Sequence, residues 1–310
     1  KAALATIRLI KKEPELIEHL SERIITLLKD RTHGVLIATI QLIIEVISVE
    51  PETKNEFKTI VPGLVRLLRN FMSIGHSPEY DVHGITDPFM QVEIIKLLGI
   101  LGANDEETSD QMNDVLAQVA NSTETNKVAG NAILYECVKT VMKIKSDGSL
   151  RNLAVNILGQ FLLNRDNNIR YVALNSLMNV VGEDANSVQK HRGTILECLK
   201  DVDISIRQRA LDLCYLLVDL NTVSQITTEL LNYLVVAPVE HKSELVSRIM
   251  GIVERFAPSK KWRIDTMITM LSIAGNHCDE GTPRIAIIFI AQAEGLQGYA
   301  THKLYKCLHE

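Results

Sequence analysis

Apolar residues recur every three or four positions through most of the chain, with polar residues between them. In the stretch 150–162 the apolar positions are Leu150, Leu153, Ala154, Ile157, Leu158, Phe161 and Leu162. Stretches that begin at Ile169 and Ile206 repeat this spacing. Because positions three and four apart lie on one face of a helix, the pattern predicts amphipathic α-helices. The stretch 35–49 is apolar nearly all round and predicts a helix that other helices cover on most sides.

Short polar breaks separate these helices. The breaks at 164–168 and 201–203 each supply Asp or Asn immediately before the next apolar stretch. Such residues cap helix N-termini by accepting a hydrogen bond from a free backbone N–H. The breaks together predict about sixteen helices, each of about 12 to 20 residues.

Some helical units resemble one another. Asn168–Leu174 reads NIRYVAL, and Ser205–Leu211 reads SIRQRAL, 37 residues later. A period of roughly 35 to 40 residues built from two helices is typical of HEAT-type repeats. Each helix pair leaves an apolar face, which the next pair covers by stacking on it. We therefore expect an all-α fold, a HEAT/armadillo-like α-solenoid that runs through residues 1–310 as a single domain.

A long irregular stretch, Gly75–Asp87, interrupts the repeats and separates residues 1–74 from residues 88–310. Loops of this length are uncommon inside compact folds and are often functional. The chain begins at Lys1 in an apolar helical pattern, and it ends at Glu310 directly after Leu308. Solenoids normally carry polar end caps, so these ends predict an internal segment of a longer solenoid.

Composition supports the helical interpretation and narrows the function. Hydrophobic residues make up 46% of the chain and aromatic residues only 5%, with 16 Gly and 8 Pro. A β-sandwich would need more turn residues and aromatics, and a disordered chain would hold fewer aliphatics. The net charge of −5 disfavours a nucleic-acid partner. No stretch has the length and apolarity of a membrane span, and the N-terminus lacks a signal-peptide profile.

Motifs for catalysis or metal binding are missing from the sequence. The five cysteines include no CxxC pair, which predicts reduced thiols of a cytosolic protein rather than a zinc or redox site. No HExxH, phosphate-binding loop or GxSxG motif occurs. We therefore expect no enzymatic activity, no cofactor and no metal.

Several motifs resemble the adaptin family of large clathrin-adaptor subunits, and its gamma type in particular. The similar stretches are Ser77–Phe89 (SPEYDVHGITDPF), Met112–Ala120 (MNDVLAQVA), Gly130–Glu136 (GNAILYE), Asn168–Leu174 and Ala257–Trp262 (APSKKW). They occur in the same order as in the family and cover most of the chain.

The resemblance implies a trunk that holds sigma, beta and mu adaptor subunits and does no chemistry. It also implies membrane recruitment by an Arf-family GTPase and phosphoinositide, and selection of cargo tails with dileucine or tyrosine motifs. The expected location is cytoplasmic, peripheral on membranes of the trans-Golgi network and endosomes and on clathrin-coated vesicles. The resemblance further implies that the lipid-binding N-terminal part, the clathrin-binding hinge and the ear of the family lie outside these 310 residues.

Two surfaces are candidates for partner contact. In the long loop, Tyr80, Asp81 and His83 could face a small subunit, or the loop could pack on its own repeat. In the second, Lys260, Lys261, Trp262 and Arg263 combine basic and aromatic side chains. That composition fits a binding hot spot or a contact with an anionic membrane. It also fits a first helical turn with solvated charges and with Trp262 packed between repeats. Arg165 with Arg170, and Arg207 with Arg209, form a second basic set. An Arg at this turn is expected to pair with a neighbouring Asp, such as Asp166 or Asp203.

Three other HEAT-repeat functions remain as alternatives. The alpha-type endocytic adaptin belongs to the same family. A nuclear transport receptor would need a strongly acidic inner face, and a phosphatase scaffold would show a more regular period near 39 residues. The net charge and the wandering period of this chain favour the adaptor.

Overall fold

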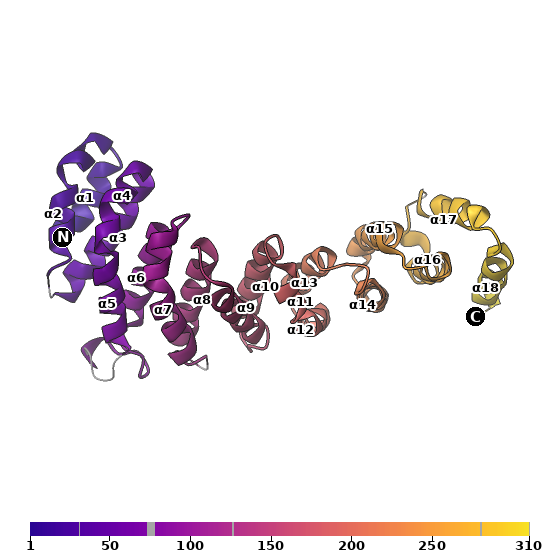
Figure 1. The fold of residues 1–310 in the computed structure, drawn as a ribbon. Coiled ribbons are helices and arrows are strands. Elements are labelled where there is room, and N and C mark those ends of the chain that lie inside the picture. Colours follow the sequence, from indigo (N-terminus) through magenta and orange to yellow (C-terminus); the bar gives the residue numbers. More distant parts are fainter. Residues whose placement is uncertain (31, 73–77, 126, 280, 310) are drawn as a thin grey trace. The chain divides into compact units, whose positions relative to one another are not determined.

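The computed structural model describes residues 1–30, 32–72, 78–125, 127–279 and 281–309. Within these ranges it contains eighteen α-helices, short 3₁₀ turns and no strand, so the predicted all-α fold is confirmed (Figure 1). The helix number exceeds the expected sixteen, and some helices are shorter than the expected 12 residues. For example, α11 (Ala185–Gln189) and α12 (Arg192–Glu197) have five and six residues.

The helices fall into two compact units, Lys1–Leu158 and Gly159–Glu310. The expectation of one continuous solenoid through both units stays a prediction. The first unit holds α1 (Ala2–Ile10), α2 (Ser21–Leu27), α3 (His33–Val49), α4 (Lys54–Phe57), α5 (Val61–Phe71), α6 (Pro88–Gly102), α7 (Glu106–Ser122), α8 (Val128–Lys143) and most of α9 (Gly148–Phe161). The second holds α10 (Asn167–Val181), α11, α12, α13 (Ile204–Leu216), α14 (Val223–Val236), α15 (Val239–Phe256), α16 (Lys260–Ala274), α17 (Gly281–Gln292) and α18 (Gln297–His309).

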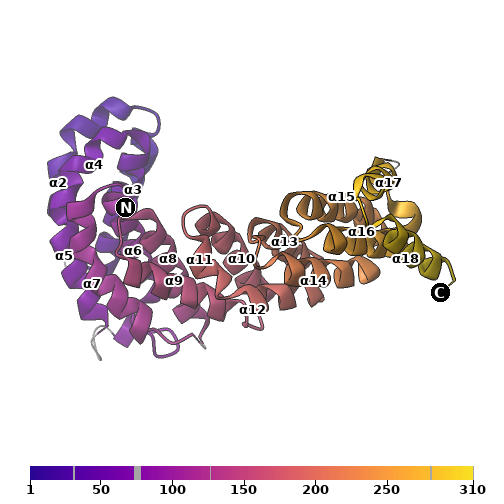
Figure 2. The ribbon, with the colours of Figure 1, turned by 45° about the vertical axis from the view of Figure 1, so that its right-hand side comes forward.

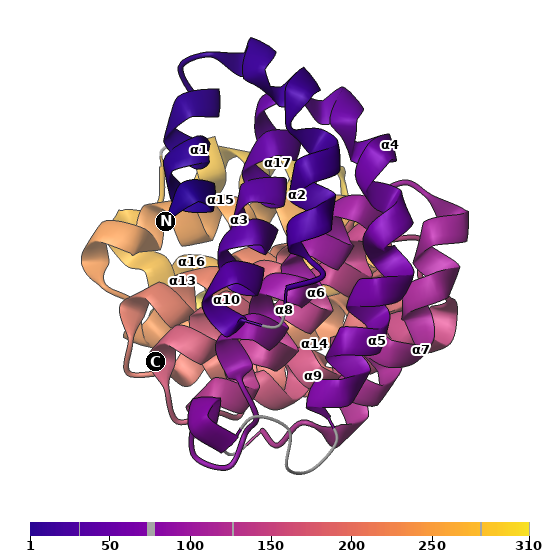
Figure 3. The same cartoon turned by 90° about the vertical axis from the view of Figure 1, so that its left-hand side faces the viewer.

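In the first unit the helices form two rows. One row runs α1, α3, α6 and α8, each in contact with the next, and the other contains α5 and α7 (Figures 2 and 3). Helix α3 lies inside its row, and Ile40, Ile43 and Val46 have no exposed surface. This burial explains why the 35–49 stretch is apolar nearly all round.

Aspartates and a serine cap many of the helices. The carboxylates of Asp166 and Asp203 accept hydrogen bonds from the backbone N–H of Asn168 and Ser205, at 2.8 and 2.9 Å. This confirms the caps expected in the breaks at 164–168 and 201–203. Each bond stabilises its helix by about 1 kcal/mol where the cap is well formed.

The 37-residue repeat is visible in the hydrogen bonds of its arginines. Arg170 donates to the carbonyl oxygen of Asn164 at 2.7 Å, and Arg207 donates to that of Asp201, 37 residues further on, at 2.8 Å. Both guanidinium groups thus close the turn that precedes their own helix.

The expected pairing of an arginine with a neighbouring Asp is seen for Arg170 and for Arg209, which lies 3.7 Å from Asp212, but the aspartates are not the two that were named. Arg170 forms an ion pair of 2.8 Å with Asp201, from the next repeat, rather than with Asp166 or Asp203. Those two carboxylates are oriented toward backbone amides as helix caps. The repeat arginine therefore joins neighbouring repeats in addition to closing its own turn.

At the start of α7, the carboxylate of Asp105 pairs with Lys58 and caps the backbone N–H of Thr108 at 3.0 Å. The hydrogen bond from Lys58 is the largest cause that lowers the pKa of Asp105 to about 2. A carboxyl whose folded pKa is depressed stabilises the fold above its unfolded pKa and loses this effect as the pH falls. We expect the melting temperature of the first unit to fall as the pH is lowered from about 4 to about 2. The part of this fall that Asp105 causes should be absent in the variant Asp105→Asn. Melting curves of both proteins across this pH range test it, and parallel curves would contradict the assignment.

Candidate functional site

The described part of the long loop, 78–87, is ordered by a tight turn. A 3₁₀ turn, Pro78–Tyr80, leads into an antiparallel bridge between Val82 and Ile85. Two backbone hydrogen bonds of 3.0 and 3.1 Å close the bridge. His83 and Gly84 form its tip with φ angles of 55° and 78°, as a two-residue turn of this kind requires. Residues 75–77 of the predicted loop lie outside the described residues.

A cluster of three side chains joins this loop to the two helices beside it. The rings of Tyr80 and His33 stack at a centroid distance of 3.9 Å and an angle of 11°. His33 Nε2 lies 2.7 Å from Asp87 Oδ2, and the other carboxylate oxygen of Asp87 accepts the backbone N–H of Met90 at 3.2 Å. Because Asp87 caps α6 and His33 begins α3, the cluster fixes the loop against both helices.

The three predicted loop residues therefore differ in their surroundings. Tyr80 packs on its own unit and is 38% exposed, whereas Asp81 and His83 are exposed to solvent. Phe89, in the first turn of α6, is 70% exposed, and sequence analysis missed it. Helix α6 is apolar on nearly every side, so the sequence pattern could not show which of its apolar residues would face solvent.

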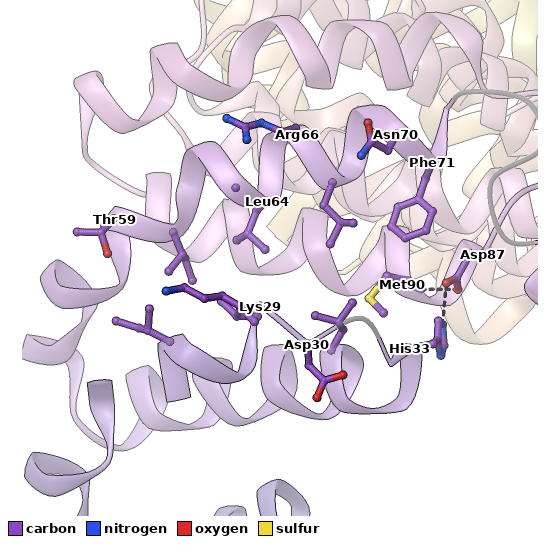
Figure 4. A pocket seen from close by; sticks show the side chains of 16 residues that line it. Lys29, Asp30, His33, Thr59, Leu64, Arg66, Asn70, Phe71, Asp87 and Met90 are labelled. Carbon is purple, nitrogen blue, oxygen red and sulfur yellow. Dashed lines mark hydrogen bonds and ion pairs between the residues drawn. The ribbon is translucent and has the colours of Figure 1, made fainter. Parts of the chain in front are cut away.

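A pocket of about 680 Å³ opens beside this cluster, and the sequence gave no indication of it (Figure 4). Its walls come from the end of α2, the start of α3, one side of α5 and the start of α6. His33 and Asp87 lie at one end, and aliphatic side chains line the rest together with Lys29 and Arg66.

In the second unit, the predicted basic and aromatic residues form the first turn of α16. Ser259 caps this helix by accepting the backbone N–H of Trp262 at 3.1 Å. Lys260 and Lys261 are both exposed, and the ammonium of Lys261 lies 4.8 Å from the centre of the Tyr299 ring in α18. This arrangement matches the alternative of a first helical turn.

Arg263 is held within its own unit. The guanidinium of Arg263 lies 3.9 Å from the centre of the Phe289 ring and 3.7 Å from a carboxylate oxygen of Glu254. Trp262 is half-buried. Arg263 therefore packs between helices, whereas Lys260 and Lys261 are both exposed to solvent.

A carboxylate of α16 fastens α18 beside this turn. Asp265 accepts hydrogen bonds from Tyr299 at 2.7 Å and from Lys303 at 2.6 Å. Burial alone would raise the pKa of Asp265, but these hydrogen bonds outweigh it and lower the pKa. The side chains around Lys261 thus serve to hold helices together.

The three buried cysteines are not activated thiols. Burial raises the pKa of the Cys137 and Cys214 thiols to about 12 and that of Cys198 to about 11. Protonated thiols are poor nucleophiles and poor metal ligands. Across the described ranges, no group of three His, Cys, Asp or Glu residues is arranged to hold a metal ion.

The comparisons with known proteins identify the family. A family model described as the adaptin N-terminal region matches residues 1–310. The chain belongs to this family. The resemblance to adaptins seen in the sequence motifs is thereby confirmed.

The similar relatives are named as gamma subunits. "AP-1 complex subunit gamma" of Dictyostelium discoideum is 50% identical over 310 residues, which are all of this adaptin chain and 35% of the relative. "AP-1 complex subunit gamma-2" of Arabidopsis thaliana is 51% identical over the same length, 36% of that relative. These relatives support the gamma type over the alternatives, and the chain spans about a third of their length.

A comparison of structures gives the same fold. A chain from a homology model of the full-length AP-3 complex in an intermediate open conformation matches 96% of this adaptin chain and 54% of its own length, with a TM-score of 0.69. At 14% sequence identity this match bears on the fold alone. Among the helices that the structure describes, none combines the length and apolarity needed to cross a membrane.

Proposed function

We propose that this chain is the middle part of the trunk of a gamma-type large subunit in a heterotetrameric clathrin adaptor. The observation that carries the proposal is the identity of half of all residues with subunits named AP-1 gamma, over the whole chain. Such a trunk is an interaction scaffold that does no chemistry. Stacked helix pairs fit this role because they provide long rigid surfaces held by a continuous apolar core.

The proposed direct partners are the sigma, beta and mu subunits of the adaptor. The assembled complex would bind an Arf-family GTPase and cargo tails with dileucine or tyrosine motifs. Clathrin binding would rest on regions outside these 310 residues. The proposed location is the cytoplasmic face of the trans-Golgi network and endosomes, where the complex associates peripherally with membranes and sorts transmembrane cargo into coated vesicles.

Co-purification of the full-length protein with adaptor subunits tests this function. We expect affinity-tagged protein, co-expressed with sigma, beta and mu subunits, to elute with all three in one gel-filtration peak. In cells, the tagged protein should lie on perinuclear puncta that disperse when Arf activation is blocked.

A phosphatase scaffold subunit carrying the same tag is the matched control, because it shares the helical repeat architecture. It should elute without adaptor subunits. If the full-length protein behaves like this control, or gives a nuclear signal, the adaptor function is wrong.

A further inference from the structure

Tyr80 differs from every other tyrosine of the chain in its secondary structure. The chain has seven tyrosines, and the other six lie in the α-helices α8, α10, α13, α14 and α18. Tyr80 belongs to the 3₁₀ turn Pro78–Tyr80, in the loop between α5 and α6. An enzyme that modifies a side chain must fit the backbone around it into a cleft, which an exposed loop allows and a helix resists. Tyr80 is therefore the tyrosine of this chain that a modifying enzyme reaches most easily.

The described part of this loop is loosely held. None of the residues 78–86 is buried, and two backbone hydrogen bonds between Val82 and Ile85 close its turn. The ring of Tyr80 stacks on His33, and within the described ranges its hydroxyl forms no hydrogen bond. A segment with few buried contacts opens locally at a small cost in free energy. The hydroxyl of Tyr80 is thus available without unfolding of the helices beside it.

Carboxylates flank this tyrosine on both sides. Glu79 precedes Tyr80 and Asp81 follows it, and both side chains are exposed. Kinases select substrates partly by the charge pattern around the acceptor, so these carboxylates suit a kinase whose substrate cleft carries basic side chains. Tyr305 is 61% exposed, but it lies within α18 and is followed by Lys306. Charge and secondary structure therefore single out the same tyrosine.

We propose that Tyr80 is a phosphorylation site for an ATP-dependent protein tyrosine kinase that recognises acidic flanking residues. The hydroxyl oxygen of Tyr80 attacks the γ-phosphorus of ATP, and the bond from this phosphorus to the β,γ-bridging oxygen breaks. ADP leaves, and the hydroxyl proton passes to the catalytic aspartate of the kinase. The proposal goes beyond the adaptor function and does not depend on it.

The phosphate releases the loop from its two helices. A phosphotyrosine carries a charge of about −1.5 to −2 at pH 7. This charge lies beside Glu79 and Asp81, and the buried Asp87 pairs with the same His33 ring on which Tyr80 stacks (Figure 4). Repulsion among these anions opposes the stack. The loop then loses the cluster that fastens it to α3 and α6.

Phosphorylation of the full-length protein in its assembled state tests the proposal. The probes are isotope-labelled ATP and the catalytic domain of a tyrosine kinase that prefers acidic substrates, and mass spectrometry locates the phosphate. We expect phosphate on Tyr80, loss of this phosphopeptide in Tyr80→Phe, and at least tenfold slower phosphorylation of Tyr80 in Glu79→Lys, Asp81→Lys. Tyr305→Phe is the matched control, because it removes a more exposed but helical tyrosine. It should leave the phosphorylation of Tyr80 unchanged.

Hydrogen exchange followed by mass spectrometry tests the release of the loop. We expect the amides of residues 78–87 to exchange at least threefold faster after phosphorylation, while those of α7 stay unchanged. His33→Ala removes the stack, so it should speed this exchange in the unmodified protein and raise the rate of Tyr80 phosphorylation severalfold. Circular dichroism of each variant shows whether its helices are intact.

Three outcomes would overturn the proposal: no phosphate on Tyr80, equal phosphorylation of the charge-reversed variant, or exchange of residues 78–87 that phosphorylation leaves unchanged or slows. Slower exchange would show that the phosphate is held against His33 instead of being repelled. Each of these outcomes can occur while co-purification with adaptor subunits succeeds, so the phosphorylation site and the adaptor function are tested separately.

Discussion

Replacing Asp201 with alanine is expected to lower the free energy of unfolding of the unit Gly159–Glu310 by about 2 to 3 kcal/mol. Asp201 pairs with Arg170 at 2.8 Å, and their side chains are only 14% and 15% exposed. Asp201 also accepts the backbone N–H of Asp203 at 2.9 Å. Its removal leaves a largely buried guanidinium without a counter-charge, although the hydrogen bond from Arg170 to Asn164 remains and reduces the loss.

Urea unfolding followed by tryptophan fluorescence measures this effect in the right unit, because Trp262 is the single tryptophan of the chain. Glu197→Ala is the matched control, because it also removes one carboxylate close to Asp201 in the chain. Glu197 forms an ion pair with Lys200 in which both side chains are exposed. Exposed pairs of this kind contribute little, so we expect no measurable change. If both variants lose the same free energy of unfolding, the Arg170–Asp201 pair contributes no more to stability than an exposed pair does. The double variant Asp201→Ala, Arg170→Met should recover part of the stability, because no buried charge is then left unpaired.

The local features of the fold were predictable from the sequence. Helices follow from the apolar spacing, and the caps at Asp166 and Asp203 follow from short-range hydrogen bonding to the next two or three residues. The 37-residue repeat was also visible in the sequence at Arg170 and Arg207. Each of these arginines donates to the carbonyl oxygen six residues before it and so closes a local turn. Each of these features depends on residues that are near neighbours in the chain.

Contacts between repeats were not predictable in the same way. The partner of Arg170 is 31 residues away, and Asp166, only four residues before Arg170, looked equally suitable until its carboxylate was found to cap a helix. Arg263 lies against Phe289 of the next helix, which no local pattern indicates. The sequence therefore showed the candidates for pairing but not the choice among them.

The candidate sites show the same division. The long loop was recognised by its lack of helical spacing, and the turn at His83–Gly84 explains part of it. Its stacking on His33 joins residues 47 positions apart. The pocket beside this stack is formed by four separate helical segments, and its existence depends on where their side chains leave space. A single sequence without a packing geometry contains no signal for such a space.

Replacing Gly99 with valine is expected to lower the free energy of unfolding of the first unit by about 3 kcal/mol. Gly99 belongs to α6, which packs closely against α8. The two helices are labelled in Figures 1 and 2. A Cβ atom added there would lie 2.7 Å from Thr140 Oγ1 and 3.2 Å from Thr140 Cγ2. Thr140 cannot easily move away, because it is buried and donates a hydrogen bond to the carbonyl oxygen of Ile95 at 3.0 Å. The two helices must then separate and lose packing along their whole contact.

Urea unfolding followed by circular dichroism tests this expectation, with Gly34→Val as the matched control in the same unit. A Cβ atom at Gly34, in the first turn of α3, would meet no atom within 4 Å. We expect this control to change the free energy of unfolding by less than about 1 kcal/mol, the range of helix propensity alone. Adding Thr140→Ala to Gly99→Val should restore more than half of the loss. The alanine lacks Oγ1 and Cγ2, the two Thr140 atoms beyond Cβ that crowd the added side chain. If the double variant is as unstable as the sum of its two single variants, the cost at Gly99 does not arise from the contact with Thr140.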